Sequence, residues 1–284
     1  MGTHNILLIG GNGMLGRAMR AALASRGIPF QSPARSECDL LQPDSIRHHS
    51  RGVSAVINCA AWTDVDGAEA NEPAATALNG TAVGQLATIC REIDAHFVHY
   101  STDYVFAGDG TAPYRTDALL APLSVYGRSK AVGEQLIAQQ VALGLRALVL
   151  RTSWLYAPWS KNFVRTIAAA AKARSNLRVV SDQCGRPTSA QHLADVTLRL
   201  LDVNATGVLH ATDGGQTTWF EFATHIAAFA SPTCRVDPCT TAEFQRPARR
   251  PAYSVLDLAP TEKLLGPMPD WRTNLDAVLT TLEP

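Results

Sequence analysis

The sequence shows no excess of charge of either sign, because 25 Lys and Arg residues balance 25 Asp and Glu residues along 284 positions. A nucleic-acid-binding protein usually carries a basic patch, so we expect no nucleic-acid partner. No apolar run approaches the roughly 18–20 residues that a transmembrane helix needs, so we expect no membrane partner. The sequence also lacks the charged and apolar segments of a signal peptide at its start. These absences predict a cytoplasmic protein.

Cysteine is scarce, and its spacing indicates no metal site. The sequence contains no C-x-x-C pair, and no histidine cluster at zinc-ligand spacing accompanies the cysteines. Scattered thiols in a chain of this size are typical of reduced, partly buried residues in a cytosolic protein. The six positions are Cys38, Cys59, Cys90, Cys184, Cys234 and Cys239.

Short apolar runs alternate with longer helical patterns along most of the chain. Continuous apolar strands between helices are typical of a parallel sheet covered on both faces. The expected strands are Ile6–Gly10, Val53–Asn58, His96–Tyr100, Ala147–Thr152 and Gly207–Ala211. The expected helical stretches are Met14–Arg26, Pro73–Asp94, Val125–Leu143, Lys161–Ala173 and Ala190–Val203. The pattern predicts an α/β fold with a Rossmann-type, doubly wound parallel sheet.

The pattern becomes less regular after about residue 155, and the segment from Ser231 to Pro284 holds many prolines. We therefore expect two domains. Residues 1–155 would form an NAD(P)-binding Rossmann domain, and residues 156–284 mainly a smaller C-terminal α/β substrate domain. The strand near residues 207–211 would return to the main sheet, so that the domains interleave.

A glycine-rich segment joins the first expected strand to the first expected helix, and it fits G-x-G-x-x-G from Gly11. Glycines permit a tight turn and close approach of the backbone, while the helix N-terminus favours a bound pyrophosphate. A glycine pattern alone also fits a flexible turn, but its position between strand and helix favours a phosphate site. The expected cofactor contacts here are Gly10, Gly13, Met14, Leu15 and Gly16.

The second strand should end near Gln31 or Ser32, where NAD-preferring sites often place an acidic residue. No acid occurs in the segment Pro29–Arg35. Arg35 can pair instead with a 2′-phosphate, so we expect NADP(H) as the cofactor, with NADH as the alternative. The other interpretation of Arg35 is a surface arginine that contacts only water. Further expected cofactor contacts are Asp39 and Leu40 near the adenine, and Ala60, Ala61, Trp62 and Ser101 after later strands.

Three residues suggest a centre for carbonyl reduction. Tyr126 and Lys130 are four residues apart at the start of a helical stretch and would share one helix face. A nearby ammonium lowers the pKa of a tyrosine, so we expect Lys130 to lower that of Tyr126. Thr102 follows a strand, where it can donate a hydrogen bond to the same carbonyl. A Tyr-x-x-x-Lys pair often occurs by chance, and its combination with the glycine turn and Thr102 carries the hypothesis.

The chain resembles the dTDP-4-dehydrorhamnose reductase family of the extended short-chain dehydrogenase/reductase superfamily. The resemblance runs nearly the full length and rests on these segments: Gly10–Gly16, Val56–Glu69, Ser101–Phe106, Tyr126–Glu134, Arg151–Tyr156, Asn162-Phe163, Asp182–Thr188, Thr217–Phe222 and Arg250–Asp257. It implies hydride transfer from NAD(P)H to C4 of dTDP-4-dehydro-L-rhamnose. Tyr126 would donate the proton, Lys130 would bind the nicotinamide ribose and Thr102 would polarise the carbonyl.

The resemblance also implies a set of contacts to the nucleotide sugar. These residues are Thr102, Asp103, Val105, Trp154, Asn162 and Arg250. Some family members hold Mg²⁺ at a dimer contact through carboxylates. Ala18 stands where we would place one of these carboxylate ligands, and alanine cannot bind a metal ion, so Mg²⁺ dependence is doubtful. A homodimer is still possible without the metal. Ala34 replaces the ribose-binding acid of many relatives, which supports NADP.

Two other functions fit the same residues. The first is another nucleotide-sugar reductase, an epimerase or a dehydratase. Epimerases are usually longer, and dehydratases generally carry a Glu after the acid, whereas Tyr104 follows Asp103 here. The second is a non-catalytic NADP-binding regulatory subunit, as in the methionine adenosyltransferase subunit that resembles this family. Such a scaffold need not keep Thr102, Tyr126 and Lys130.

Overall fold

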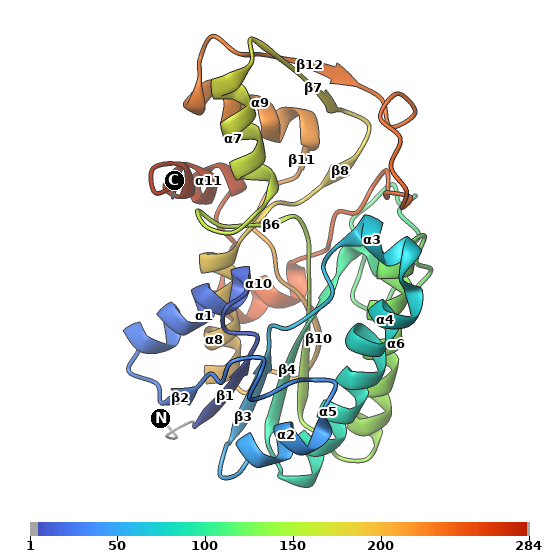
Figure 1. Ribbon diagram of the computed structural model, residues 1–284, viewed down its shortest axis with the longest axis vertical. Helices are drawn as coiled ribbons and strands as arrows, with labels where there is room; N and C mark the ends of the chain where they lie inside the picture. Colours follow the sequence, from blue (N-terminus) through green and yellow to red (C-terminus); the bar gives the residue numbers. More distant parts are fainter. Residues whose placement is uncertain (1–4, 283–284) are drawn as a thin grey trace.

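A six-stranded parallel sheet forms the base of the molecule in the computed structural model, which describes residues 5–282 (Figure 1). Its strand order is β10-β5-β4-β3-β1-β2. The strands are β1 (Ile6–Ile9), β2 (Phe30–Gln31), β3 (Ala55–Asn58), β4 (His96–Thr102), β5 (Ala147–Thr152) and β10 (Gly207–His210). The chain leaves β1 toward β2 and then returns to the other side of β1 for β3. The carboxyl ends of β1 and β3 therefore form the switch point at which α/β sheets bind ligands.

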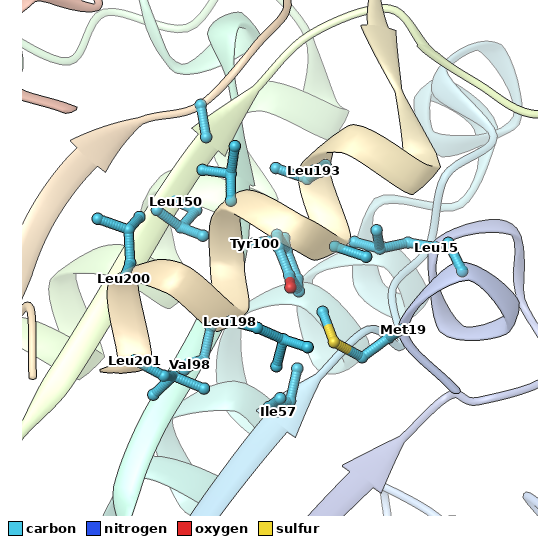
Figure 2. Packing of buried hydrophobic residues seen from close by; sticks show 14 of the residues in the cluster. Leu15, Met19, Ile57, Val98, Tyr100, Leu150, Leu193, Leu198, Leu200 and Leu201 are labelled. Carbon is cyan, nitrogen blue, oxygen red and sulfur yellow. The ribbon is translucent and has the colours of Figure 1, made fainter. Parts of the chain in front are cut away.

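Helices cover both faces of this sheet (Figure 1). On one face lie α1 (Met14–Ser25) and α8 (Ala190–Asp202), and on the other α2 (Pro43–His49), α5 (Ala82–Glu92) and α6 (Val125–Ala142). Figure 2 shows leucines of α8 lying over the apolar side chains of the central strands, with Leu15 and Met19 of α1 beside them. Burial from water on both faces explains why these strands are continuous apolar runs. The predicted Rossmann-type fold is confirmed.

A second, smaller group of elements lies above the carboxyl edge of the sheet (Figure 1). It contains α7 (Phe163–Ala173), α9 (Trp219–Ala230), α11 (Trp271–Leu279), and the parallel pair β7 (Asn176–Val180) and β12 (Arg235–Cys239). Two short pairs complete it: β6 (Leu155–Tyr156) with β9 (Thr188–Ser189), and β8 (Cys184–Gly185) with β11 (Thr217–Thr218). Its core is a separate aromatic and aliphatic cluster around Phe222 and Trp271.

The chain crosses between the two parts more than once. After β9 it returns through α8 to β10, which pairs with β5, and α10 (Ala259–Leu265) packs beside α8 and β10. The remaining elements are α3 (Val65–Ala70), α4 (Glu72–Thr76), the π-helical turn η1 (Ala77–Thr81) and the 3₁₀ turn η2 (Asp103–Val105). Within residues 5–282, no helix combines the length and apolar character that crossing a membrane requires.

Two expected helices differ from the structure in detail. The stretch predicted over Pro73–Asp94 is divided into α4, η1 and α5. A Cβ at Gly80 in η1 would lie 2.8 Å from Val132 of α6, so the π turn occurs where two helices pack unusually closely. The helix predicted from Lys161 begins at Phe163, because the Asn162 side chain caps it by accepting from the N–H of Arg165 at 3.2 Å.

Candidate active site

One cavity of about 710 Å³ lies along the carboxyl ends of β1, β3 and β4 and extends beneath the upper elements. Its lining includes the glycine turn at one end and aromatic side chains at the other. Of the sequence-predicted residues, it brings together Gly10, Gly13, Met14, Leu15, Arg35, Asp39, Leu40, Ala60, Ala61, Ser101, Thr102, Asp103, Tyr126, Lys130, Trp154 and Asn162. Residues as far apart in the sequence as Gly10 and Asn162 thus face one space that is large enough for a ligand.

The glycine turn packs tightly against the end of β3. Gly10 has a φ of +78°, and a Cβ there would lie 2.6 Å from the backbone N of Ala60. Gly16 does not line the cavity, but a Cβ at this position would lie 2.1 Å from the carbonyl oxygen of Gly10. Glycine at both positions lets the N-terminus of α1 approach the turn. A helix N-terminus in this place suits a pyrophosphate, so the turn fits a dinucleotide.

The edge of the cavity beyond β2 carries Arg35, Asp39 and Leu40. The Arg35 side chain is 77% exposed, and its Nε lies 3.8 Å from a carboxylate oxygen of Asp39. Such a guanidinium is free to turn toward a phosphate. Trp62 lies outside the lining, and its indole N–H donates to the carbonyl oxygen of Asp64 at 2.8 Å.

Tyr126 reaches Thr102 because α6 begins against η2. The Ser124 hydroxyl caps α6 by accepting from the N–H of Gly127, and a Cβ at Gly127 would lie only 2.2 Å from the carbonyl oxygen of Tyr104. This contact places the first turn of α6 beside the end of β4, where Thr102 is the last residue. The rings of Tyr104 and Tyr126 meet edge to face at 5.9 Å.

The pKa of Tyr126 moves in the opposite direction from the sequence-based expectation. Burial raises it to about 12, the hydroxyl of Thr102 lowers it partly, and the charge of Asp103 raises it further. The expected lowering by Lys130 is wrong for this geometry, because the Lys130 ammonium donates to the carbonyl oxygen of Tyr100 at 2.5 Å. A raised pKa keeps the phenol protonated at neutral pH, and this is the form that a proton donor needs.

Lys130 ends a buried row of polar side chains that the sequence did not indicate. Oδ1 of Asn58 accepts from the N–H of Ala60 at 3.1 Å, so its Nδ2 faces Nδ1 of His99 at 3.2 Å. His99 Nε2 in turn lies 3.4 Å from Lys130 Nζ. Burial and the Lys130 charge hold the pKa of His99 well below its usual value, so the ring is neutral. Burial also lowers the pKa of Lys130 to about 8.

An aromatic wall closes the other end of the cavity. Trp154 has a φ of +47°, which is rare for a bulky residue and marks a conformation held by its surroundings. Its ring stacks on Trp219 with centroids 3.6 Å apart, and a Cβ at Gly185 would lie 2.7 Å from its indole carbons. Trp219 also lines the cavity. Trp219 was not predicted from the sequence as a site residue, although it directly follows the N-cap Thr218, within the capping box that Thr218 forms with Glu221.

Three predicted substrate contacts have other neighbours. Val105 is fully buried beside Phe106 and does not line the cavity, so its expected sugar contact is not found. Asn162 lines the cavity, but its amide caps α7 and donates to three backbone carbonyls. Arg250 lies outside the lining and pairs with Asp66 at 3.1 Å. Its contact to a diphosphate therefore stays a prediction.

The described part of the chain contains no group of three or more His, Cys, Asp or Glu side chains placed to hold a metal ion. The lining of the cavity combines backbone groups and hydroxyls with the phenol of Tyr126 and the ammonium of Lys130. These donors fit the phosphates, ribose and carbonyl of an organic cofactor and its substrate.

Comparisons with known proteins agree with this geometry. A family model described as "RmlD substrate binding domain" matches residues 4–283. A dTDP-4-dehydrorhamnose reductase of Burkholderia thailandensis is 38% identical over 94% of this chain and 95% of its own. A dTDP-4-keto-6-deoxy-D-glucose reductase of Streptomyces niveus is 36% identical over 96% of each chain.

The fold matches a solved member of the same group. A crystal structure of dTDP-4-dehydrorhamnose reductase from Bacillus anthracis in complex with NADP superposes with a TM-score of 0.92. That protein is 31% identical, and the match covers 98% of this chain and 99% of the other. With the family model matching nearly the whole chain and these relatives matching it end to end, the chain belongs to the dTDP-4-dehydrorhamnose reductase family of NAD(P)H-dependent oxidoreductases.

Proposed function

We propose that the protein reduces the C4 keto group of dTDP-4-dehydro-L-rhamnose to give dTDP-L-rhamnose, with NADPH as the hydride donor. The observation that carries this proposal is the convergence of Thr102, Tyr126, Lys130 and Trp154 with the glycine turn on one cavity. The name of the B. thailandensis relative supplies the substrate. The NADP in the B. anthracis complex supports the cofactor.

Each residue of the centre has one task in this reaction. NADPH supplies the hydride when it is bound. Tyr126 keeps its proton near neutral pH, because burial raises its pKa to about 12, and it transfers that proton to the oxygen that becomes the C4 hydroxyl. Lys130 holds the nicotinamide ribose, and Thr102 donates a hydrogen bond to the keto oxygen. Acid catalysis by a positioned side chain typically contributes about 10²–10⁴-fold.

The aromatic wall supports a deoxysugar as the reacting group. Trp154 is stacked on Trp219 and offers a broad apolar surface at the end of the cavity opposite the glycine turn. An indole face suits the apolar side of a 6-deoxy sugar. We further propose that residues 1–155 and β10 hold the cofactor, while residues 156–284 mainly bind the nucleotide sugar.

A substrate panel tests the function. NADPH oxidation is measured with dTDP-4-dehydro-L-rhamnose, with other 4-keto nucleotide sugars and with sugar nucleotides that lack a keto group, and product stereochemistry is determined. Tyr126→Phe should lower kcat by about 10²–10⁴-fold while NADPH still binds. Tyr104→Phe is the matched control, because the Tyr104 ring lies 5.9 Å from that of Tyr126 but has no role in the proposed proton transfer. Wild-type kinetics in Tyr126→Phe would contradict the assignment.

The cofactor preference has its own test. Arg35→Ala should lower the ratio of kcat/KM for NADPH to that for NADH by roughly tenfold or more, because a guanidinium–phosphate contact is charge-assisted. Arg115→Ala is the control, because Arg115 is equally exposed and pairs with a nearby Asp117 outside the cavity. An unchanged ratio in Arg35→Ala would remove the basis for NADP selection.

A second candidate is the reduction of a different 4-keto sugar. The S. niveus relative, named for a 4-keto-6-deoxy-D-glucose substrate, matches this chain nearly as well as the rhamnose enzyme does. The same panel separates the two substrates. A third outcome, tight NADPH binding without turnover of any keto sugar, would favour a non-catalytic binding subunit.

A further inference from the structure

The single hydrogen of the Thr102 hydroxyl is already engaged. Thr102 Oγ1 donates to Oδ1 of Asp103 at 2.9 Å and accepts from the backbone N–H of Tyr104 at 3.2 Å. A hydroxyl has only one hydrogen to donate. In this arrangement that hydrogen points at the Asp103 carboxyl, so Thr102 cannot donate it to a keto oxygen at the same time.

Asp103 is an unusual neighbour for a catalytic hydroxyl. It is 2% exposed, it lines the same cavity, and Oδ2 has no hydrogen-bond partner. Among residues 5–282, no cation forms an ion pair with it; the guanidinium of Arg250 lies over the ring of the neighbouring Tyr104, 5.9 Å from the ring centroid. The hydroxyl of Ser254 approaches from the loop before α10 and favours the ionised carboxyl.

The titratable groups that face Asp103 do not compete with it near neutral pH. Tyr104 on η2 and Tyr126 on α6 are the two that interact with its charge, and burial raises the pKa of both phenols, that of Tyr126 to about 12. Both phenols therefore stay protonated while Asp103 titrates. Burial raises the pKa of Asp103 itself to about 7. The carboxyl is thus the group in this contact set that changes its charge in the physiological range.

We propose that Asp103 is a positioning residue whose protonation state decides where the Thr102 hydrogen points. When Asp103 is protonated, its own hydrogen is donated to Thr102 Oγ1, and the Thr102 hydrogen is released toward the keto oxygen. When Asp103 is ionised, its carboxylate again accepts the hydrogen bond from the Thr102 hydroxyl, so this hydrogen no longer points toward the keto oxygen. This inference rests on the proposed reduction.

The switch involves hydrogen bonds alone. The hydrogen of Asp103 stays on its carboxyl, and the only proton that is transferred is the one from Tyr126 to the new hydroxyl group. Because the active form is the protonated one, kcat/KM should fall as the pH rises through the Asp103 titration, by about tenfold per pH unit. Stronger polarisation of the keto oxygen is thereby confined to neutral and mildly acidic conditions.

The test is the pH profile of kcat/KM for dTDP-4-dehydro-L-rhamnose at saturating NADPH, from pH 5.5 to 9. Wild-type enzyme should lose activity above about pH 7. The side chain in Asp103→Asn cannot ionise and can present an N–H to Thr102. The descending limb of the profile near pH 7 should therefore be absent in this variant, and its kcat/KM should decline only near pH 8, where Lys130 titrates. Thr102→Val should lose the limb too, because Asp103 then has no hydroxyl to control.

Lys130→Arg is the control that identifies the titrating group, because arginine keeps its charge throughout this range. It should retain the limb near pH 7. The proposal is overturned if Asp103→Asn keeps that limb or if Lys130→Arg removes it.

A measurement on the wild-type holoenzyme needs no variant. In ¹³C NMR of protein with labelled aspartate carboxyls, one carboxyl should titrate near pH 7, and the absence of any such resonance between pH 6 and 8 overturns the proposal. Failure of the wild type to oxidise NADPH with any keto sugar would instead refute the proposed function, while the NMR titration still reports on Asp103.

Discussion

The buried carboxyl of Asp103 should make the stability of this protein depend strongly on pH. Burial raises its pKa from 3.8 to about 7 in the folded chain. The folded state therefore binds this proton about 3 pH units more tightly than the unfolded state, which corresponds to about 4 kcal/mol. Because the folded pKa lies above the unfolded one, this stabilisation is complete below pH 4 and is lost as the pH rises to about 7.

Asp103→Asn removes this titration. The free energy of unfolding of the variant, relative to wild type, should rise by about 3 kcal/mol between pH 5 and pH 8 and then stay constant, since the amide has no charge to desolvate. Urea denaturation followed by circular dichroism at pH 5, 6, 7 and 8 measures the difference. Asp117→Asn is the control: Asp117 lies on the surface, and its pKa is lowered by Arg115, so both states are ionised across this range. A difference between Asp103→Asn and wild type that stays flat within about 1 kcal/mol would refute the reasoning.

Two further substitutions probe the cofactor end and the ammonium. Gly16→Ala places a Cβ 2.1 Å from the carbonyl oxygen of Gly10, so α1 must move away from the glycine turn. NADPH affinity, measured by fluorescence titration, should fall by roughly tenfold or more. Unchanged affinity would show that this close approach is dispensable. Lys130→Met should raise the free energy of unfolding at pH 7 by up to about 3 kcal/mol, because the folded pKa is lowered from 10.5 to about 8. That gain should shrink as the pH rises from 8 toward 10.5, where the wild-type lysine becomes neutral in both states; a gain independent of pH in urea denaturation would contradict the assigned cause.

The order of the elements followed from the sequence, because each depends on local patterns. Apolar runs and helical periodicity gave β1, β3, β4, β5 and β10 to within a few residues, and the glycine turn that joins β1 to α1 predicts a phosphate site there. Tyr126 and Lys130 were predicted to share a helix face from their spacing alone, and both lie on α6 and line the cavity. Such relations extend over one or two helical turns and need no knowledge of the rest of the chain.

The buried polar contacts could not be predicted in this way. Asn58, His99 and Lys130 come from three elements and form one row only because β3, β4 and α6 are adjacent in the folded chain. The stacking of Trp154 on Trp219 likewise joins the segment before β6 to the start of α9. No local pattern records which distant residue will be the neighbour.

What the sequence by itself determined is the type of fold, and it also predicted the place of the glycine turn and the hydroxyl, phenol and ammonium that we propose as the reacting groups. What only the tertiary structure decided is the electrostatic state of those groups. Residues remote in sequence bury Lys130 and Asp103 and partly bury Tyr126, and this burial moves the pKa values of Tyr126, Lys130 and Asp103 to about 12, 8 and 7. The reason is that desolvation depends on everything packed around a charge, and that packing exists only once the chain has folded.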